Sequence, residues 1–114
     1  MFEACCGRFL DGGAAAPTAG ALMRSRYTAY AMGRDEYVLA TWHASTRPSV
    51  LFEPGEARPK WVGLSVEAEE TAGDRATVRF VAKARTSAGA MTLSETSRFV
   101  REDGRWFYVD GELQ

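Results

Sequence analysis

The stretch WVGLSVEAEETAGDRATVRFVAKART, residues 61–86, decides the fold, because apolar and polar residues alternate in it with a period of two. The first run of alternation begins at Val62 and ends near Ala68, and the second runs from Val78 to Arg85. The sequence Ala-Gly-Asp at 72–74 lies between them and favours a turn. Two such runs joined by a short turn predict an antiparallel β-hairpin.

The same pattern continues toward the C-terminus. Ser-Ala-Gly at 87–89 favours a second turn, and Glu-Asp-Gly at 102–104 favours a third. The third strand places five alternate residues on one face: Met91, Leu93, Glu95, Ser97 and Phe99. In the fourth strand, predicted over 106–110, Trp106 and Tyr108 share one face, while Phe107 and Val109 share the other. The sequence therefore predicts four hairpin-linked strands.

Helical patterns precede the strands. Residues 19–32 have apolar positions three and four apart, with Thr18 as the predicted N-cap and Gly33 at the C-terminal end. A second, shorter helix is predicted from Asp35, as its cap, to about Trp42. Helices followed by hairpin-linked strands indicate an α+β fold with an antiparallel sheet.

The composition is that of one globular domain. The chain has 114 residues, of which 46% are hydrophobic and 25% charged, enough for a hydrophobic core without disulfides. Fourteen basic and fifteen acidic residues give a net charge of -1, which argues against a nucleic-acid or anionic-membrane binder. The sequence has neither an apolar run of about 18 residues nor a signal-peptide pattern at residues 1–10. We therefore expect a cytoplasmic protein that does not enter a membrane.

Several short motifs carry a resemblance over nearly the whole chain. They are Cys5-Cys6-Gly7, LMRSRY at 22–27, Thr41-Trp42-His43 with Ser45-Thr46-Arg47, Trp61 with Gly63-Leu64, Ser97-Arg98-Phe99, and WFYVDG at 106–111. In this order they resemble the bacterial YchJ-like family. The resemblance implies a nuclear transport factor 2-like cone over residues 17–114, in which N-terminal helices pack on a curved four-stranded antiparallel sheet and leave a pocket. The family has no established biochemical activity, so the resemblance implies none for this chain.

The chain departs from the family pattern at two points. Family members usually carry a Cys-x-Cys pair shortly before the Cys-Cys pair, and the two pairs together form the small SEC-C zinc motif. In this chain the only cysteines within residues 1–16 are Cys5 and Cys6. The family pattern before Ser97 is Glu-Arg, whereas this chain has Glu95-Thr96. A role of that arginine is therefore not transferred to this chain.

Cys5 and Cys6 supply at most two of the four ligands of a structural zinc site. We interpret them as a remnant half-site, so that zinc would bind only in a longer form or through a site shared by two chains. No cofactor is otherwise indicated. Elemental analysis of protein purified without chelator should find far less than one zinc per chain. A stoichiometric zinc that survives dialysis would contradict this prediction.

The helical spacing of residues 19–32 and the alternation of the third strand together predict one buried ion pair. On the first helix Arg26 shares the apolar face, and on the third strand Glu95 shares the inward face, so we expect a direct or near-direct pair beneath the helix. Asp110 is the second candidate partner, and Asp110 or a hydroxyl of Tyr27, Tyr30 or Tyr108 should satisfy the remaining donors. Arg24 points the other way and should be more exposed. The pair could be structural, or it could serve as an anion clamp or a catalytic dyad.

The other candidate site residues come from the motifs. His43 is the only histidine and could either form a structural hydrogen bond or transfer protons. The remaining pocket or ion-pair candidates are Tyr27, Arg47, Ser97, Arg98, Trp106 and Tyr108. No phosphate-binding glycine loop or nucleophile elbow is present.

Two classes of function remain open. The first is a non-catalytic module that binds a small ligand or a protein, and we favour it. The alternative is a small pocket enzyme of isomerase or dehydratase type, in which a histidine and a carboxylate would move protons; only fold analogy supports it. An enzyme would bring His43, a tyrosine or a carboxylate to an open cavity with one partner unpaired. The basic residues Arg79, Lys83 and Arg85 on one sheet face favour a monomer.

Overall fold

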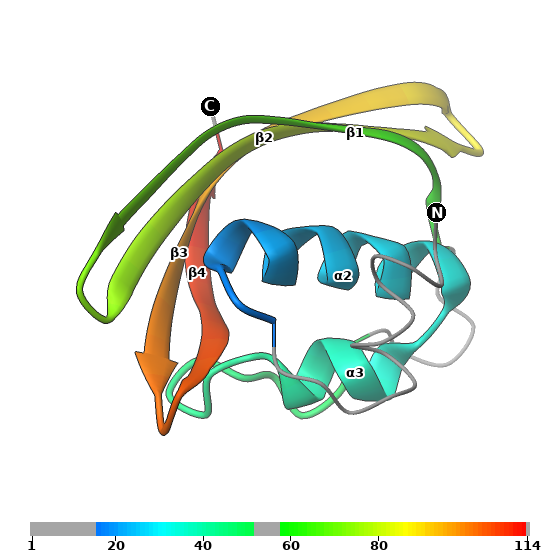
Figure 1. Ribbon diagram of the computed structural model, residues 1–114. Coiled ribbons are helices and arrows are strands. Elements are labelled where there is room, and N and C mark those ends of the chain that lie inside the picture. The colour runs from blue at the N-terminus through cyan, green and yellow to red at the C-terminus, as the bar shows by residue number, and fades with distance from the viewer. Residues whose placement is uncertain (1–15, 52–57, 114) are drawn as a thin grey trace.

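The computed structural model describes residues 16–51 and 58–113. Two helices precede one four-stranded antiparallel sheet of order β1-β2-β3-β4. The elements are α2 (Ala19–Met32), α3 (Asp35–Ala40), β1 (Lys60–Ala72), β2 (Arg75–Thr86), β3 (Gly89–Glu102) and β4 (Arg105–Leu113). The sheet curves around α2, and α3 lies on the side of α2 away from β1 and β2 (Figure 1). The predicted α+β fold is confirmed.

Helix α2 begins and ends where the sequence indicates. The Thr18 side chain accepts a hydrogen bond from the backbone N–H of Ala21 at 3.0 Å, and Gly33 takes a left-handed conformation with φ 73°. A carboxylate of the sheet also reaches this helix N-terminus, because the backbone N–H of Gly20 donates to Glu69 Oε2 at 3.0 Å. A side chain at position 20 would overlap that carboxylate. The absence of a side chain at Gly20 therefore allows Glu69 of β1 to cap the N-terminus of α2.

Helix α3 differs from its prediction at both ends. Asp35 is its first residue and Arg34 its N-cap, so the prediction of Asp35 as the cap is wrong. The Asp35 carboxylate instead accepts two hydrogen bonds from Arg58, at 2.9 and 2.7 Å. The helix stops at Ala40, before the predicted Trp42, because Trp42 forms a parallel bridge with Tyr108 of β4.

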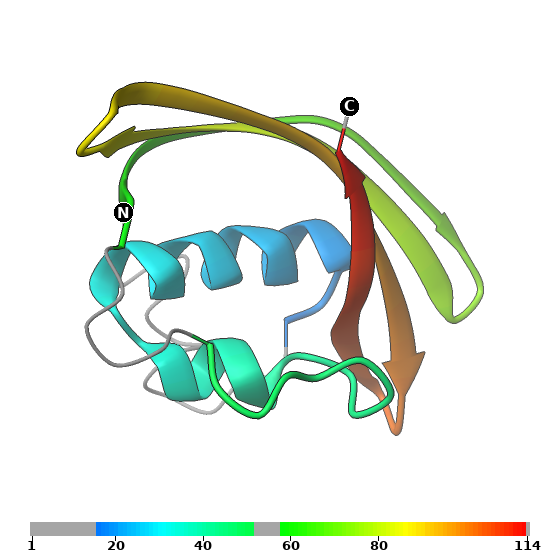
Figure 2. The ribbon, with the colours of Figure 1, turned by 180° about the vertical axis from the view of Figure 1, so that it is seen from behind.

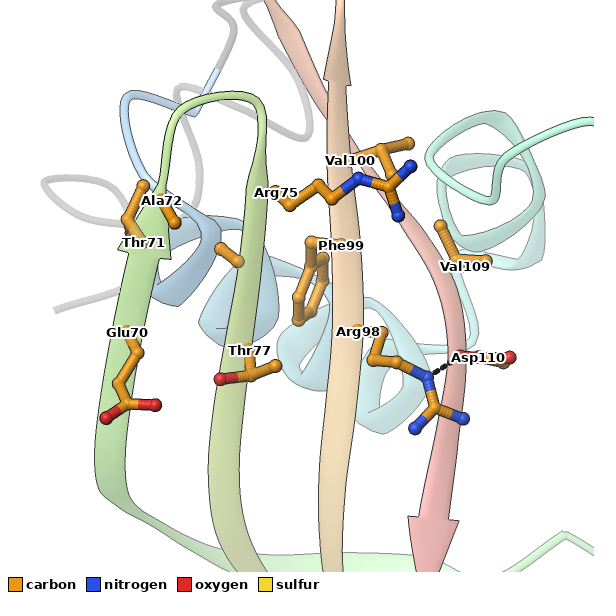
Figure 3. Close-up of a pocket in the computed structure, with 11 residues that line it drawn as sticks. Glu70, Thr71, Ala72, Arg75, Thr77, Arg98, Phe99, Val100, Val109 and Asp110 are labelled. Atoms are coloured by element: carbon orange, nitrogen blue, oxygen red, sulfur yellow. Dashed lines mark hydrogen bonds and ion pairs between the residues drawn. The ribbon is translucent and has the colours of Figure 1, made fainter.

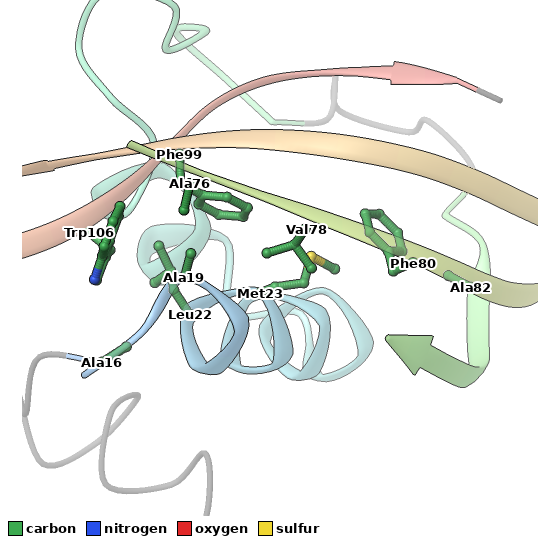
Figure 4. Close-up of a cluster of buried hydrophobic side chains, with 10 residues drawn as sticks. All are labelled: Ala16, Ala19, Leu22, Met23, Ala76, Val78, Phe80, Ala82, Phe99 and Trp106. Carbon is green, nitrogen blue, oxygen red and sulfur yellow. The ribbon is translucent and has the colours of Figure 1, made fainter. Parts of the chain in front are cut away.

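The core lies between α2 and the concave face of the sheet (Figure 4). Leu22 and Met23 of α2 are buried against alternate residues of β2, among them Val78 and Phe80. Phe99 of β3 and Trp106 of β4 complete the cluster. β2 keeps the predicted alternation without a break, which is why all its even-numbered residues from 76 to 84 are buried.

Three β-bulges interrupt the predicted alternation, two in β1 and one in β4, and the second of β1 lies between Val66 and Ala68. The register of β1 shifts between Trp61 and Gly63, and Val62 is 53% exposed although the pattern places it inside. In β4, Tyr108 pairs with Phe99 while Asp110 pairs with Arg98, so Val109 is the extra residue. The bulge sends Asp110 to the outer face, opposite to its predicted direction.

The segment after α3 runs along the edge of β4 (Figure 2). The backbone N–H of Tyr108 donates to the Thr41 carbonyl at 2.8 Å, and that of His43 donates to the Tyr108 carbonyl at 2.7 Å. The Thr46 hydroxyl donates to the carbonyl of Val109 at 2.6 Å. These bonds satisfy part of an edge strand that would otherwise be open to other chains. Within residues 16–51 and 58–113, no helix is long and apolar enough to cross a membrane.

Candidate functional site

Two hollows, one on each face of the sheet, are candidate sites. The larger, of about 860 Å³, is an open groove on the outer face of the sheet (Figure 3). Its Arg98 is engaged by carboxylates of β4: Arg98 Nε lies 2.6 Å from Asp110 Oδ1, and Arg98 Nη1 lies 3.0 Å from Glu112 Oε1. These hydrogen bonds raise the pKa of Arg98. Because the ion pairs are exposed, they contribute little to stability and define no enclosed site.

The second hollow, of about 210 Å³, is more enclosed and lies between α2 and the concave face of the sheet. Helix α2 supplies one wall and strands β1 to β4 supply the other. Its lining residues are Met23, Arg26, Tyr27, Tyr30, Trp61, Phe80, Ala82, Leu93, Glu95, Ser97 and Tyr108. Aromatic walls with a few polar groups at one end are typical of small-molecule sites. We therefore take this cavity as the candidate site.

Arg26 is the most buried charged residue of the cavity, with 4% of its surface exposed. Its Nη1 donates to the carbonyl of Val38 at 2.7 Å and to the hydroxyl of Thr41 at 2.8 Å, both at the end of α3. Its guanidinium carbon lies 4.5 Å from the ring centre of Tyr108 and 5.3 Å from that of Trp42. Burial lowers the pKa of Arg26, but the group remains protonated because its ordinary value is so high.

Glu95 enters the cavity from β3. Its Oε2 accepts a hydrogen bond from the buried hydroxyl of Ser97 at 2.6 Å. Gly111 of β4 lies against the same carboxylate, and a Cβ atom at that position would overlap it. The glycine that ends the motif WFYVDG therefore makes room for Glu95, and the bulge at Val109 is what turns Gly111 inward.

The predicted contact between Arg26 and Glu95 is corrected by the structure. Both side chains face the same cavity, as their periodicities predict. Among the described residues, however, no ion pair within 4.0 Å joins them. The carbonyl of Val38 and the hydroxyl of Thr41 take up Nη1 instead, while the negative charge of Glu95 still acts on Arg26 through space. Asp110, the second predicted partner, lies on the outer face with Arg98.

Two tyrosine hydroxyls lie in this electrostatic environment. Burial raises the pKa of Tyr30, and the neighbouring Arg26 partly opposes that shift. Burial, followed by the negative charge of Glu95, raises the pKa of Tyr108 to about 12. Both phenols therefore stay protonated at neutral pH, where they serve as hydrogen-bonding groups.

The raised pKa of Tyr108 predicts a pH effect. Between pH 10, its ordinary value, and about 12, the unfolded chain has released the Tyr108 proton while the folded chain still holds it. The free energy of unfolding should therefore fall as pH rises through this window, and it should fall less steeply in Tyr108→Phe. Absorbance titration at 295 nm should lose its last phenol transition in that variant. An unchanged last transition would contradict the prediction.

His43 lies away from the cavity. Its Nε2 is 2.7 Å from Glu102 Oε2, its Nδ1 is 2.7 Å from Ser45 Oγ, and its ring meets Phe107 edge-on at 6.1 Å. Glu102 closes the turn between β3 and β4, so the contact fastens the segment after α3 to that turn. The histidine–carboxylate pair of this protein, His43 with Glu102, therefore lies outside the cavity, and His43 and Glu95 are in separate parts of the fold.

Comparison with known proteins identifies the family. Residues 18–111 match the family model described as the middle NTF2-like domain of YchJ. The chain belongs to the YchJ-like family. A UPF0225 protein of Polaromonas naphthalenivorans is 54% identical over 113 residues, which cover 97% of this chain and 81% of that protein. One from Chromobacterium violaceum is 53% identical over 113 residues, covering 95% and 84%.

Two solved structures of SEC-C motif-containing proteins have the same fold. The solution structure of one from Rhodopseudomonas palustris has a TM-score of 0.86 and 32% identity, covering 98% of this chain and 91% of that one. The crystal structure of one from Psychrobacter arcticus has a TM-score of 0.80 and 26% identity, covering 100% and 73%. The expected YchJ-like membership and NTF2-like fold are therefore confirmed. The names of these four proteins state no reaction.

The remaining YchJ-like motif residues are placed as follows. Tyr27 lines the cavity and meets Trp61 edge-on at 6.1 Å, and burial raises its pKa. Trp106 is a core residue, stacked by Arg101 at 5.1 Å. Arg24 is exposed, as predicted, and Arg47 donates to the Trp42 carbonyl at 3.0 Å outside the cavity.

The sequence did not reveal every group around the site. Tyr30 is not among the missed groups, because the helical spacing placed it on the face of Arg26, and it lines the cavity. Thr41 and Val38 could not be found in this way, because only the docking of α3 brings them to the guanidinium. Cys5 and Cys6 lie outside the described residues, so their interpretation stays a prediction. Within the described ranges, no cluster of three or more metal-ligating side chains occurs.

Proposed function

We propose that this protein is a non-catalytic module that binds a small molecule in the cavity between α2 and the sheet. One observation carries the proposal: a partly enclosed, aromatic-walled hollow of about 210 Å³ is lined by a buried arginine and a carboxylate. Sites of this kind combine apolar area for affinity with a few polar groups for orientation. The volume is below the roughly 300–1,000 Å³ of drug-sized sites, which indicates a small ligand.

The polar groups of the cavity support binding rather than proton transfer. Every buried side-chain nitrogen or oxygen of the described residues has a hydrogen-bond partner. A general base or acid is instead expected to keep one position open toward the substrate. The only histidine bonds to Glu102 and Ser45 elsewhere, and the raised pKa values of Tyr30 and Tyr108 make them poor proton donors at neutral pH.

The experiment is a fragment screen by ligand-observed NMR on the full chain. Leu93→Trp should fill part of the cavity, whereas Val62→Trp adds the same ring to an exposed position. Fragments should bind the unmodified chain and Val62→Trp alike, and lose at least about tenfold in affinity in Leu93→Trp. Equal binding to all three proteins, or a screen without hits, would refute the proposal.

We also propose that the module acts as a cytoplasmic monomer. The exposed face of β2 presents Arg75, Arg79, Lys83 and Arg85, and a two-fold pairing of this face would bring like charges together. Sedimentation equilibrium should give a mass near the 12.5 kDa of one chain. A mass of twice that value at micromolar concentration would contradict the expectation.

A further inference from the structure

We infer that the ligand of this cavity is a small neutral molecule with a carboxamide-like head group, held between Arg26 and Glu95, on an apolar, ring-shaped body. The inference rests on the proposed function and names the class of ligand. It follows from the two opposite charges that line one cavity without touching each other.

The guanidinium and the carboxylate are each held in place by the protein. Arg26 is fixed by the two bonds from Nη1 to the end of α3 and by the faces of Tyr108 and Trp42. Glu95 is fixed by the bond from Ser97 to Oε2 and by the close approach of Gly111. Because Ser97 occupies Oε2, a ligand that donates a hydrogen bond would be met by Oε1. Both charged groups are therefore preorganised before a ligand arrives.

The charge balance selects the head group. A carboxylate ligand would be attracted by Arg26 but repelled by Glu95. An ammonium ligand would be attracted by Glu95 but repelled by Arg26. A zwitterion would satisfy both charges, but both of its own charges would have to leave water. A carboxamide accepts a hydrogen bond through its oxygen and donates through its nitrogen without a net charge. It therefore complements Arg26 and Glu95 at the lowest desolvation cost.

The apolar residues of the cavity indicate the shape of the rest of the ligand. Tyr27 and Trp61 meet edge-on at 6.1 Å with an interplanar angle of 67°, and Phe80, Leu93 and Met23 continue the apolar surface. Aromatic walls of this kind pack well against a flat ring. The volume of about 210 Å³ allows little more than one ring with its head group.

The experiment compares three probes that share a ring and differ in charge: benzamide, benzoate and benzylamine. Each is titrated into the full chain and followed by amide NMR shifts. Benzamide should bind at least about tenfold more tightly than either charged probe. In Glu95→Gln the preference should move toward benzoate by about tenfold, because the repelling carboxylate is gone.

Two further variants keep the test sharp. Gly111→Ala keeps the charge of Glu95 but pushes its carboxylate aside, so it should weaken benzamide by a similar factor. Glu112→Gln removes a negative charge from β4 on the outer side, where Glu112 meets Arg98, and should change nothing. Far-UV circular dichroism checks each variant for folding. If Glu95→Gln does not fold, the benzamide affinity of Gly111→Ala decides the test.

The outcomes separate this inference from the proposed function. Equal affinities for the three probes, or ratios unchanged in Glu95→Gln and Gly111→Ala, would refute the carboxamide inference while leaving cavity binding intact. A charged probe that binds best would refute it in the same way. If none of the three probes binds, the inference fails, and the fragment screen with Leu93→Trp decides the proposed function by itself.

Discussion

Arg26→Met should lower the free energy of unfolding by about 3 kcal/mol, because it removes charge-assisted hydrogen bonds from a buried site. The variant loses both bonds from Nη1, to Val38 and Thr41, which fasten α3 to α2. It also loses the guanidinium over the Tyr108 ring and leaves Glu95 without a positive neighbour in the cavity. Methionine keeps the packing of the apolar arginine stem but leaves the place of the guanidinium unfilled.

Urea denaturation followed by circular dichroism measures this effect. Arg24→Ala is the matched control, because Arg24 lies on the same helix with an exposed side chain and should cost under about 1 kcal/mol. Glu95→Gln combined with Arg26→Met should cost less than the sum of the two single changes, since the charges interact through space. An Arg26→Met variant as stable as Arg24→Ala would show that the contacts at the end of α3 contribute nothing.

The fold followed from the sequence wherever periodicity alone decides position. β2 alternates without interruption, and the caps of α2 at Thr18 and Gly33 were both predicted. The prediction failed where a strand contains one extra residue. Val62 is itself the extra residue of a bulge in β1, and Asp110 follows the extra residue Val109 in β4, so both were assigned to the wrong face. Nothing in a local pattern of hydrophobicity marks such a residue.

The candidate site was predicted in part for the same reason. Arg26 and Glu95 were correctly turned inward, because each lies on a regular segment of helix or strand. Their partners depend on how distant elements dock, and no spacing in the sequence brings Val38 to Arg26 or His43 to Glu102. Gly111 faces Glu95 only because of the bulge at Val109, so its role cannot be predicted from regular alternation. Sequence patterns thus orient residues, whereas tertiary docking assigns their partners.

Phe99→Ala should cost about 3–5 kcal/mol, because it leaves a large void in the centre of the core. Phe99 is 1% exposed and its ring meets that of Tyr108 at 5.8 Å, with Leu22 and Trp106 in the same cluster (Figure 4). The position is also beside the β4 bulge, where Phe99 pairs with Tyr108. A close-packed neighbourhood of this kind relaxes only partly around a deleted ring.

The matched control for Phe99 is Phe107, which lies on the opposite face of the sheet and is only partly buried. Phe107 meets the ring of His43 edge-on, so Phe107→Ala should loosen the segment after α3 but cost under about 1.5 kcal/mol. Thermal and urea denaturation of both variants give the comparison. Equal losses would mean that the outer face is as tightly packed as the inner one, since the two changes delete the same ring. A much larger loss for Phe99→Ala would instead place the stabilising core on the concave side of the sheet.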